Sequence, residues 1–249
     1  MTLRPLISVL IALLVPVPAA ADGLPSRVAE GRVEAVEAGG VLRLDDGRRV
    51  RLALLEERPE VTDRLGALAA GRRVTLHWPT EQHDRHGRLV AHAVRDDGMW
   101  LQQALIGEGA ARVVTFSDER AAAADLLTVE DVARRAGRGL WGSAAFAPLS
   151  ALDVAAADRM RGRLAVIEGV VASAAVVRGR LYLNFGQDWR TDVTVSVRSA
   201  ALRTFPPEAR EAVHWQGRSV RVRGWVQRYN GPLIEADHPE AIELLAVEQ

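Results

Sequence analysis

The sequence predicts a mainly β protein with helices, of the α+β class, in which two small β-barrels follow one another. First, each half of the chain contains five strand candidates with a helical or irregular segment after the third. Second, the turn Asp45-Asp46-Gly47 joins two strand-like runs, which is a strong hairpin signal. Third, residues 144–158 are rich in alanine, proline and serine, which predicts a linker between the halves. A chain of 249 residues that is 48% hydrophobic is long enough for two domains, which we place at 22–143 and 159–249.

The N-terminal half predicts a five-stranded barrel with helices. A helix that begins after Pro59 separates the third strand from the fourth, and this is the order of an oligonucleotide-binding (OB) barrel. Ser117 is a candidate N-cap for a long final helix that ends at Gly137 and Gly139. The expected strands are 28–36, 41–44, 48–55, 72–78 and 88–94, and the expected helices are 61–68, 99–108 and 117–136.

The first 21 residues have the pattern of a secretory signal peptide. Arg4 precedes an apolar run from Leu6 to Val15, which is too short to span a bilayer, and small residues end the segment at Ala21. We therefore expect cleavage after Ala21, an exported protein that is periplasmic or secreted, and no membrane contact after processing; a retained membrane anchor is the alternative. The sequence contains no cysteine, which excludes disulfides and thiolate metal sites.

Charge composition does not by itself indicate nucleic-acid binding. The 32 basic residues are all arginine, and 32 acidic residues balance them. A nucleic-acid binder usually carries a basic excess, so attraction would have to come from a local patch. Arginine can nevertheless hold a phosphate in a bidentate manner, which lysine cannot.

The stretch from Arg49 to Glu60 is where we expect chemistry. An arginine-bearing strand runs into an acidic turn, so that Arg51, Glu57 and Glu60 come close together in the chain. One arginine and two carboxylates are the groups that phosphodiester chemistry uses. The alternative is an ordinary strand end, in which Glu60 follows Pro59 because an acidic residue favours a helix N-terminus.

Several motifs together resemble the thermonuclease, or staphylococcal-nuclease-like, family. They occur in the family's order between residues 27 and 141. The matching pieces are Val50-Arg51-Leu52-Ala53, Arg58-Pro59-Glu60, Asp84-Arg85-His86-Gly87-Arg88-Leu89, Gln103-Ala104-Leu105-Ile106, Gly109-Ala110-Ala111-Arg112-Val113 and Gly139-Leu140-Trp141. The ordered set is specific, although each piece alone is weak.

The resemblance implies a calcium-dependent phosphodiesterase on a five-stranded barrel. Carried over by position, Arg51 and Arg88 match the two arginines that bind the scissile phosphate, and Glu60 matches the glutamate that assists the attacking water. Glu57 matches one of the two metal-binding aspartates. One residue is inserted between Arg51 and Glu60, so Glu56 is the alternative metal ligand.

The other metal-binding aspartate of the family is missing from this chain. The corresponding turn reads Val36-Glu37-Ala38-Gly39-Gly40-Val41, which places Gly39 or Gly40 at its position. Glycine offers calcium only a backbone carbonyl, and the nearby Glu37 is the remaining candidate ligand. We therefore expect low calcium affinity and weak or lost hydrolysis.

The C-terminal half predicts a second OB-like barrel that binds single strands. Its expected strands are 162–172, 180–185, 192–197, 219–226 and 233–236. Aromatic residues alternate with arginines, as on a surface that stacks bases and follows phosphates. The alternative is that the aromatics fill the core and the arginines face solvent. The candidate nucleic-acid-binding residues are Arg180, Tyr182, Trp189, Arg221 and Arg223.

Histidines and tryptophans of the first half are expected to be structural. His77, His83, His86 and His92 lack the spacing of a zinc site. Three functions remain open: an exported protein that acts on or binds single-stranded DNA or RNA with little or no hydrolysis, an active calcium-dependent endonuclease, and an envelope module that binds proteins and no nucleic acid.

Overall fold

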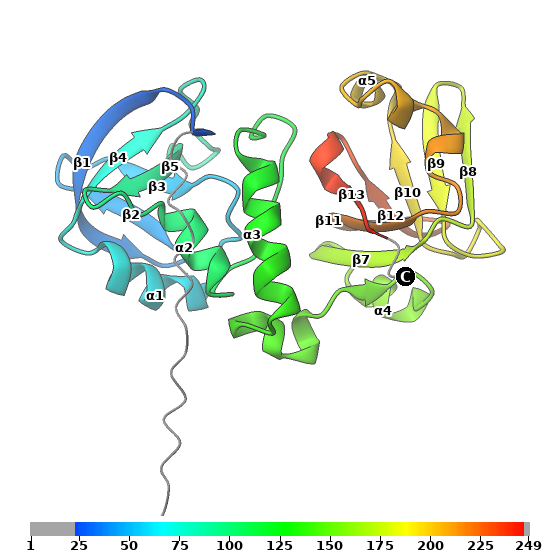
Figure 1. Ribbon diagram of the computed structural model, residues 1–249, viewed down its shortest axis with the longest axis horizontal. Helices are drawn as coiled ribbons and strands as arrows, with labels where there is room; N and C mark the ends of the chain where they lie inside the picture. Colours follow the sequence, from blue (N-terminus) through cyan, green and yellow to red (C-terminus); the bar gives the residue numbers. More distant parts are fainter. Residues whose placement is uncertain (1–22, 247–249) are drawn as a thin grey trace, which may run out of the picture.

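The computed structural model describes residues 23–246, so the signal peptide predicted at residues 1–21 lies outside the described residues. The first half forms a closed barrel with the strand order β1-β2-β3-β5-β4, on the left of Figure 1. Its strands are β1 (Arg27–Glu37), β2 (Val41–Leu44), β3 (Arg49–Leu52), β4 (Arg73–His77) and β5 (Leu89–Arg95). This confirms the predicted α+β fold class with a five-stranded barrel.

Local sequence signals explain the path of the barrel. The β2–β3 hairpin turns at Gly47, whose φ of 85° lies in the left-handed region that glycine adopts without steric cost. Helix α1 (Pro59–Ala69) begins at Pro59, where the missing N–H of proline is harmless because that donor has no partner within the helix. The apolar face of α1, with Val61, Leu65 and Leu68, packs into the barrel core.

Helix α3 begins later than the sequence predicts. The helix was expected from Ser117, but α3 spans Ala123–Arg135 and follows Ala122, which has a φ of 61°. Residues 116–119 instead form a tight loop, in which the Glu119 N–H donates to the carbonyl of Phe116. This loop places Phe116 and Glu119 outside the helix, in the wall of the cleft described below.

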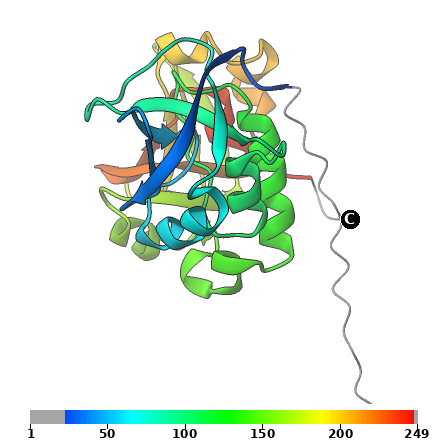
Figure 2. The same cartoon turned by 90° about the vertical axis from the view of Figure 1, so that its left-hand side faces the viewer.

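Helices α2 and α3 flank the barrel on the side of the second sheet. The helix α2 spans Leu101–Gly107, and α3 stands between the barrel and the second sheet in Figure 1. The side view shows β1 crossing the front of the barrel, with the second sheet behind (Figure 2). Short 3-10 turns, η2 (Gly139–Gly142) and η3 (Ala144–Phe146), lead out of the first half.

The segment predicted as a linker is folded against both halves. Strand β6 (Leu149–Ser150) pairs in parallel with β7, and α4 (Val154–Arg159) follows with Asp153 as its N-cap. The Phe146 ring lies 4.7 Å from the guanidinium carbon of Arg58 in the first half. The segment predicted as a linker therefore contains short turns, a short strand and a small packed helix.

The second half forms an eight-stranded sheet among the described residues. The strand order is β6-β7-β11-β12-β10-β9-β8, with β13 paired to β11. β7 and β8 lie at or near opposite ends of this path although only two residues separate them in the chain, so the sheet curls back on itself. The bounds are β7 (Leu164–Val170), β8 (Ser173–Val177), β9 (Arg180–Asn184), β10 (Thr194–Val197), β11 (Ser219–Tyr229), β12 (Gly231–Glu235) and β13 (Ile242–Leu244).

The two sheets share one pairing rule. In the first barrel β3 runs parallel to β5, and in the second sheet β10 runs parallel to β12; apart from the short β6–β7 pair, the other strand pairs described are antiparallel. The helical segment after β10 is broken into α5 (Ser199–Leu202) and the turns η4 (Glu208–Arg210) and η5 (Ala212–His214), and η6 (Pro239–Ala241) precedes β13. The five strands predicted for the second half overlap β7, β9, β10, β11 and β12, whereas β6, β8 and β13 were not predicted.

A buried ion-pair cluster joins the halves. Arg223 of β11 is 3% exposed, and its guanidinium donates to Glu130 of α3 at 2.8 Å, to Glu243 at 2.7 Å and to the Val113 carbonyl at 3.0 Å. Arg221 contacts Glu168 and, on α3, Asp131. Removing one partner from such a buried cluster leaves an uncompensated charge, so the cluster fixes how the two halves meet.

Among residues 23–246, no helix combines the length and apolar character that crossing a bilayer requires.

Candidate nucleic-acid interface

A cleft of about 820 Å³ opens between the first barrel and the second sheet. Arg51 of β3 and Arg88 before β5 reach it from the barrel, and Phe116 comes from the loop before α3. Trp225 of β11 closes it from the second half, because its ring lies 5.5 Å from the ring of Phe116. Both halves of the chain therefore build the walls of this cleft.

The two predicted phosphate-binding arginines lie side by side because β3 and β5 are paired. Val50 pairs with Leu89 and Arg51 with Val90 in the parallel register, which places Arg51 and Arg88 at the same end of the barrel. Each is only 8% exposed. The hydrogen bonds to Glu57, described below, and to Asp84 raise the pKa of Arg88 against the opposing effect of burial, so this cation is permanent.

Asp84 orients Arg88 within the turn between β4 and β5. One carboxylate oxygen accepts the backbone N–H groups of His86 and Arg88, and the other accepts the Arg88 Nε at 2.6 Å. Burial alone would raise the pKa of Asp84, but the hydrogen bonds from Arg88 and His86 outweigh it and lower the pKa to about 2. Asp84 is therefore ionised at neutral pH, and it presents the Arg88 guanidinium to the cleft.

Of the three candidate metal ligands, only Glu57 lies in the cleft. Its two oxygens accept the Arg88 Nη1 and Nη2 at 2.6 and 2.8 Å. Glu56 forms a bidentate pair with Arg112 at 2.8 and 2.9 Å, and one oxygen of Glu37 accepts hydrogen bonds from both the Nε and the Nη2 of Arg49. The inserted residue thus turns Glu56 out of the site and leaves Glu57 as the carboxylate beside Arg88.

Glu60, the predicted partner of the attacking water, does not line the cleft. It is exposed in the first turn of α1, and its nearest charged partner is Arg58 at 3.2 Å. The pKa of Glu60 is lowered, first by its own backbone N–H at the helix N-terminus. The structure therefore brings together Arg51, Arg88 and Glu57, and leaves Glu60 at the outer edge of the site.

The glycine turn that replaces the missing aspartate passes beside Glu57. A Cβ atom built on Gly39 would lie 3.5 Å from the Glu57 Oε2 atom, whereas one on Gly40 would meet the Val61 side chain at 3.0 Å. Gly39 thus occupies the position from which an aspartate would face Glu57. Gly40 faces the core instead.

The side chains present do not fit a calcium ion. No cluster of three or more histidine, aspartate or glutamate side chains suited to a metal occurs within residues 23–246. All four carboxylate oxygens of Glu57 and Asp84 already accept hydrogen bonds from the turn that carries Arg88. Calcium needs six to eight oxygen ligands, and this site offers them to arginine and to the backbone instead.

Glu119 is one of the cleft residues that sequence reasoning missed. It lies in the loop before α3, where its carboxylate accepts a hydrogen bond from the Arg51 guanidinium. Burial raises the pKa of Glu119, although the charge of Arg51 opposes this, and its Oε2 atom has no hydrogen-bond partner among the described residues. The run Ser117-Asp118-Glu119 resembles the acidic first turn of a helix, and that signal concealed its role.

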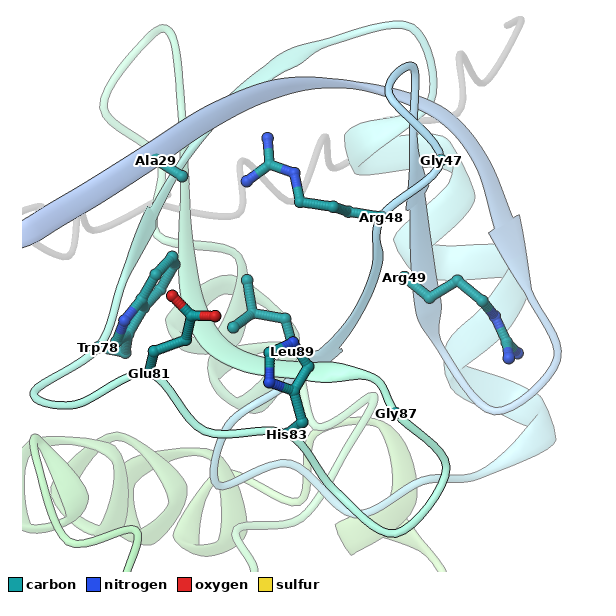
Figure 3. Close-up of a pocket in the computed structure, with 9 residues that line it drawn as sticks. All are labelled: Ala29, Gly47, Arg48, Arg49, Trp78, Glu81, His83, Gly87 and Leu89. Atoms are coloured by element: carbon teal, nitrogen blue, oxygen red, sulfur yellow. The ribbon is translucent and has the colours of Figure 1, made fainter.

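A smaller hollow beside the cleft lacks the arrangement of a phosphate site. Figure 3 shows Arg48, Trp78 and Glu81 around this space of about 330 Å³, while Arg49 points away from it. The Arg48 guanidinium is already bonded to Asp46 and to the Glu30 carbonyl. His83 lines both spaces, so the hollow adjoins the cleft through the loop that carries His83.

The predicted structural roles of the other histidines agree with their surroundings. His92 is buried against Trp100, and burial lowers the pKa of His92 to about 4, which keeps it neutral. His77 contacts the Pro25 carbonyl at 3.0 Å, and His86 bonds to its neighbour Arg85.

The five candidate residues of the second half divide into two groups. Arg221 and Arg223 are buried in the ion-pair cluster at α3, so their prediction as nucleic-acid contacts is wrong. The alternation that suggested an exposed arginine face instead places two guanidinium groups against carboxylates of the first half. Arg180, Tyr182 and Trp189 lie together on the outer face of the second sheet.

The fold and the cleft define a class of protein, a five-stranded barrel that presents two arginines and flanking carboxylates at one end. Within that class, the chain belongs to the staphylococcal nuclease family. The family pattern described as "Staphylococcal nuclease homologue" matches residues 60–143, which include Arg88. Two proteins from Escherichia coli O157:H7 and Escherichia coli, each called "Uncharacterized endonuclease", are 32% identical over 124 residues, covering 46% of this chain and 78% of theirs.

Proposed function

We propose that the protein binds single-stranded nucleic acid in the cleft and hydrolyses phosphodiester bonds weakly or not at all. The observation that carries this proposal is the pair of buried, permanently charged arginines, Arg51 and Arg88, which converge in one cleft. Membership of the nuclease family and the printed names of the relatives support nucleic acid as the ligand.

Binding needs only rearrangement of the existing ion pairs. A phosphate that enters the cleft would replace Glu57 on Arg88 and Glu119 on Arg51, which are carboxylates in the positions that phosphate oxygens would take. Arginine suits this exchange because its planar donors match carboxylate and phosphate alike. Phe116 and Trp225 supply aromatic faces against which an unpaired base can stack.

Turnover is expected to be poor because two parts of the reaction lack their residues. No carboxylate occupies the position of Gly39, so the calcium that polarises the phosphodiester in the family has lost a ligand. Glu60 is also exposed and bound to Arg58 rather than aimed into the cleft. The phosphate-binding part of the site is thus retained better than the hydrolytic part.

We propose in addition that the protein is exported, on the basis of the signal-peptide pattern in residues 1–21. The absence of cysteine leaves the fold independent of the redox state of the compartment that it reaches.

The decisive experiment measures binding and cleavage separately on the purified protein. Fluorescence anisotropy with a labelled single-stranded oligonucleotide reports binding, and gel analysis with calcium or with a chelator reports cleavage. Arg51→Ala and Arg88→Ala should each weaken binding, whereas Arg49→Ala, on the same strand but outside the cleft, should not. Efficient cleavage by the unmodified protein that survives Arg51→Ala would contradict the proposal.

A further inference from the structure

The outer face of the second sheet carries a continuous row of polar and aromatic side chains. Tyr182 of β9 pairs with Ala175 of β8 on one side and with Ser196 of β10 on the other. Asn184 pairs with Thr194 in the same way, and Thr194 pairs with Leu233 of β12. Because side chains alternate between the faces of a strand, these residues share the face opposite the core residues Leu181 and Leu183.

This face is hollowed into a cavity of about 480 Å³, which is in the range of small-ligand sites. Three aromatic residues surround it: Tyr182 on the sheet, Trp189 on the loop after β9, and Tyr229 at the end of β11. Trp189 is 53% exposed and Tyr229 is 69% exposed. Large aromatic side chains at the rim of a cavity are costly to leave in water, and they mark surfaces that bind a partner.

The floor of the cavity contains an unsatisfied polar group. Ser196 is 1% exposed, and its hydroxyl has no hydrogen-bond partner among the described residues. The neighbouring Thr194 hydroxyl donates to the Asn184 Oδ1 atom at 3.1 Å, and the Asn184 amide donates to Ser173 at 3.3 Å. A buried hydroxyl without a partner is unfavourable, and a polar ligand atom could satisfy the Ser196 hydroxyl only after the neighbouring side chains move.

A second hollow of about 670 Å³ continues from the first and is rich in arginine. The two share Val177, Arg180 and Tyr182, and the second is also lined by Arg178 and Arg198. Glu235 holds Arg180 at 3.0 Å and Arg198 at 2.6 Å, which fixes the two guanidinium groups. Among the described residues, no carboxylate lines either hollow, so this end of the groove favours an anion.

We propose that this groove is a second binding site, which holds an unpaired nucleotide of a single-stranded nucleic acid. The base stacks against Tyr182, Trp189 and Tyr229, and the phosphate lies against Arg178, Arg180 and Arg198. An aromatic cavity that opens directly onto an arginine cluster matches the flat base and charged phosphate of one nucleotide. Arg190, whose guanidinium carbon lies 4.6 Å from the Trp189 ring centroid, extends the positive charge along the rim.

The choice of nucleic acid as ligand rests on the proposed function of the cleft, but the groove is a separate site with its own residues. None of its lining residues lines the cleft. A double-stranded segment would present no free base face to the cavity. The groove is therefore expected to prefer single strands, independently of what the cleft does.

The test uses the full purified protein with a fluorescein-labelled oligothymidine and, in parallel, a matched duplex. Trp189→Ala and Tyr229→Ala should each weaken single-strand binding by roughly tenfold, the usual effect of removing one stacking partner. Tyr229 is exposed, so its truncation removes little buried area, and Trp189→Phe should retain most of the affinity. Arg218→Ala, on an exposed arginine outside both sites, is the matched control for Arg198→Ala.

Photocross-linking assigns the contact to one site or the other. An oligonucleotide that carries 4-thiothymidine should form adducts on Tyr182, Trp189 or Tyr229, detected by mass spectrometry of the digested protein. Adducts confined to cleft residues, together with unchanged affinity of the groove variants, would overturn the inference and leave the cleft proposal standing. Loss of affinity in the groove variants but not in Arg51→Ala would support the groove site and contradict the cleft proposal. Equal affinity for duplex and single strand would also contradict the groove site, and no binding by the unmodified protein would refute both proposals.

Discussion

Arg51 and Glu119 form a partly buried ion pair across the cleft, although they lie 68 residues apart in the chain. The arginine comes from a barrel strand, whereas the glutamate comes from the loop that precedes α3. The carboxylate therefore occupies the same guanidinium that the proposed function assigns to a phosphate. A ligand must displace it, so the affinity of the cleft depends on Glu119 as well as on Arg51.

Replacing this glutamate should strengthen binding. Glu119→Gln removes the competing charge while keeping the shape of the side chain, so affinity for a single-stranded oligonucleotide should rise several-fold at neutral pH. The pKa of Glu119 is raised in the folded state, which means that the native protein binds this proton more tightly than the unfolded chain does. Folding therefore becomes less favourable as pH rises past the ordinary pKa of a glutamate, because the buried carboxyl then has to lose its proton. Glu119→Gln should accordingly not destabilise the protein at neutral pH.

Anisotropy titrations at neutral and mildly acidic pH check this prediction. The advantage of Glu119→Gln should shrink as the pH is lowered, because burial raises the pKa of Glu119 and the native carboxylate takes up its proton at a higher pH than an ordinary glutamate does. Asp63→Asn, on an exposed carboxylate outside the cleft, is the control for a general change in charge. Equal affinities of the Gln variant and the unmodified protein at neutral pH would show that Glu119 does not compete with the ligand.

Restoring the missing carboxylate should raise calcium-dependent cleavage. Gly39→Asp places its side chain beside Glu57, and aspartate tolerates a positive φ better than most residues do. Cleavage and calcium binding, the latter by isothermal titration, should both exceed those of the unmodified protein. The gain should disappear when Arg51→Ala is added.

The neighbouring position supplies the matched control. Gly40→Asp introduces the same charge, but its Cβ would press on Val61 in the core, so it should destabilise the protein without creating calcium-dependent activity. If Gly40→Asp and Gly39→Asp restored cleavage equally, the assignment of the lost ligand to Gly39 would be wrong.

Asp84 should contribute stability that depends on pH. Its folded pKa of about 2 lies below the ordinary value of 3.8, so its contribution is fully present above pH 3.8 and is lost as pH falls toward 2. The depression corresponds to about 2 kcal/mol. Urea unfolding of the unmodified protein and of Asp84→Asn should therefore differ by about that amount at pH 7, with the gap closing near pH 2. A gap that is independent of pH would mean that the carboxylate charge is not what stabilises the turn.

Arg223 should be essential to the junction of the two halves. Arg223→Met leaves the Glu130 carboxylate buried without its cation, which typically costs about 3–5 kcal/mol. Adding Glu130→Gln should recover part of the loss, because the uncompensated charge is then removed while the Val113 N–H keeps an acceptor. Urea unfolding curves of the single and double variants measure this coupling, and additive effects would exclude it.

Limited proteolysis near residues 144–158 would report whether each half still folds alone, as their separate apolar cores predict.

Processing of the N-terminus is a further test of export. The mature protein should begin at about Asp22, because the small residues before it fit a signal-peptidase site. N-terminal sequencing of protein recovered from the periplasm or medium gives the answer. Material that still carries Leu6 to Val15 would indicate a retained anchor.

The sequence predicted the barrel from local patterns, and its two arginines from the resemblance to the nuclease family. The turn at Gly47 and the alternation after Arg49 define the β2–β3 hairpin, and the spacing of Arg51 and Arg88 follows from family motifs. Glu119 and Trp225 were not predicted as cleft residues, because their positions depend on how a loop and a distant strand meet the barrel. Arg221 and Arg223 were misread for a related reason: alternation shows which side chains share a face, but not whether carboxylates from another domain cover it.

Strand β11 carries residues of both the cleft and the groove, so one strand of nucleic acid can contact both sites. It carries Trp225 at the wall of the cleft and Tyr229 at the rim of the groove, and at about 3.3 Å per residue these two side chains are separated by only about 13 Å of strand. An oligonucleotide tethered at one end in the cleft would therefore hold its other end at high effective concentration near the groove. Affinity plotted against oligonucleotide length would then rise steeply at the length that first spans both contacts and level off beyond it, so that the protein measures the length of a strand rather than reading its sequence.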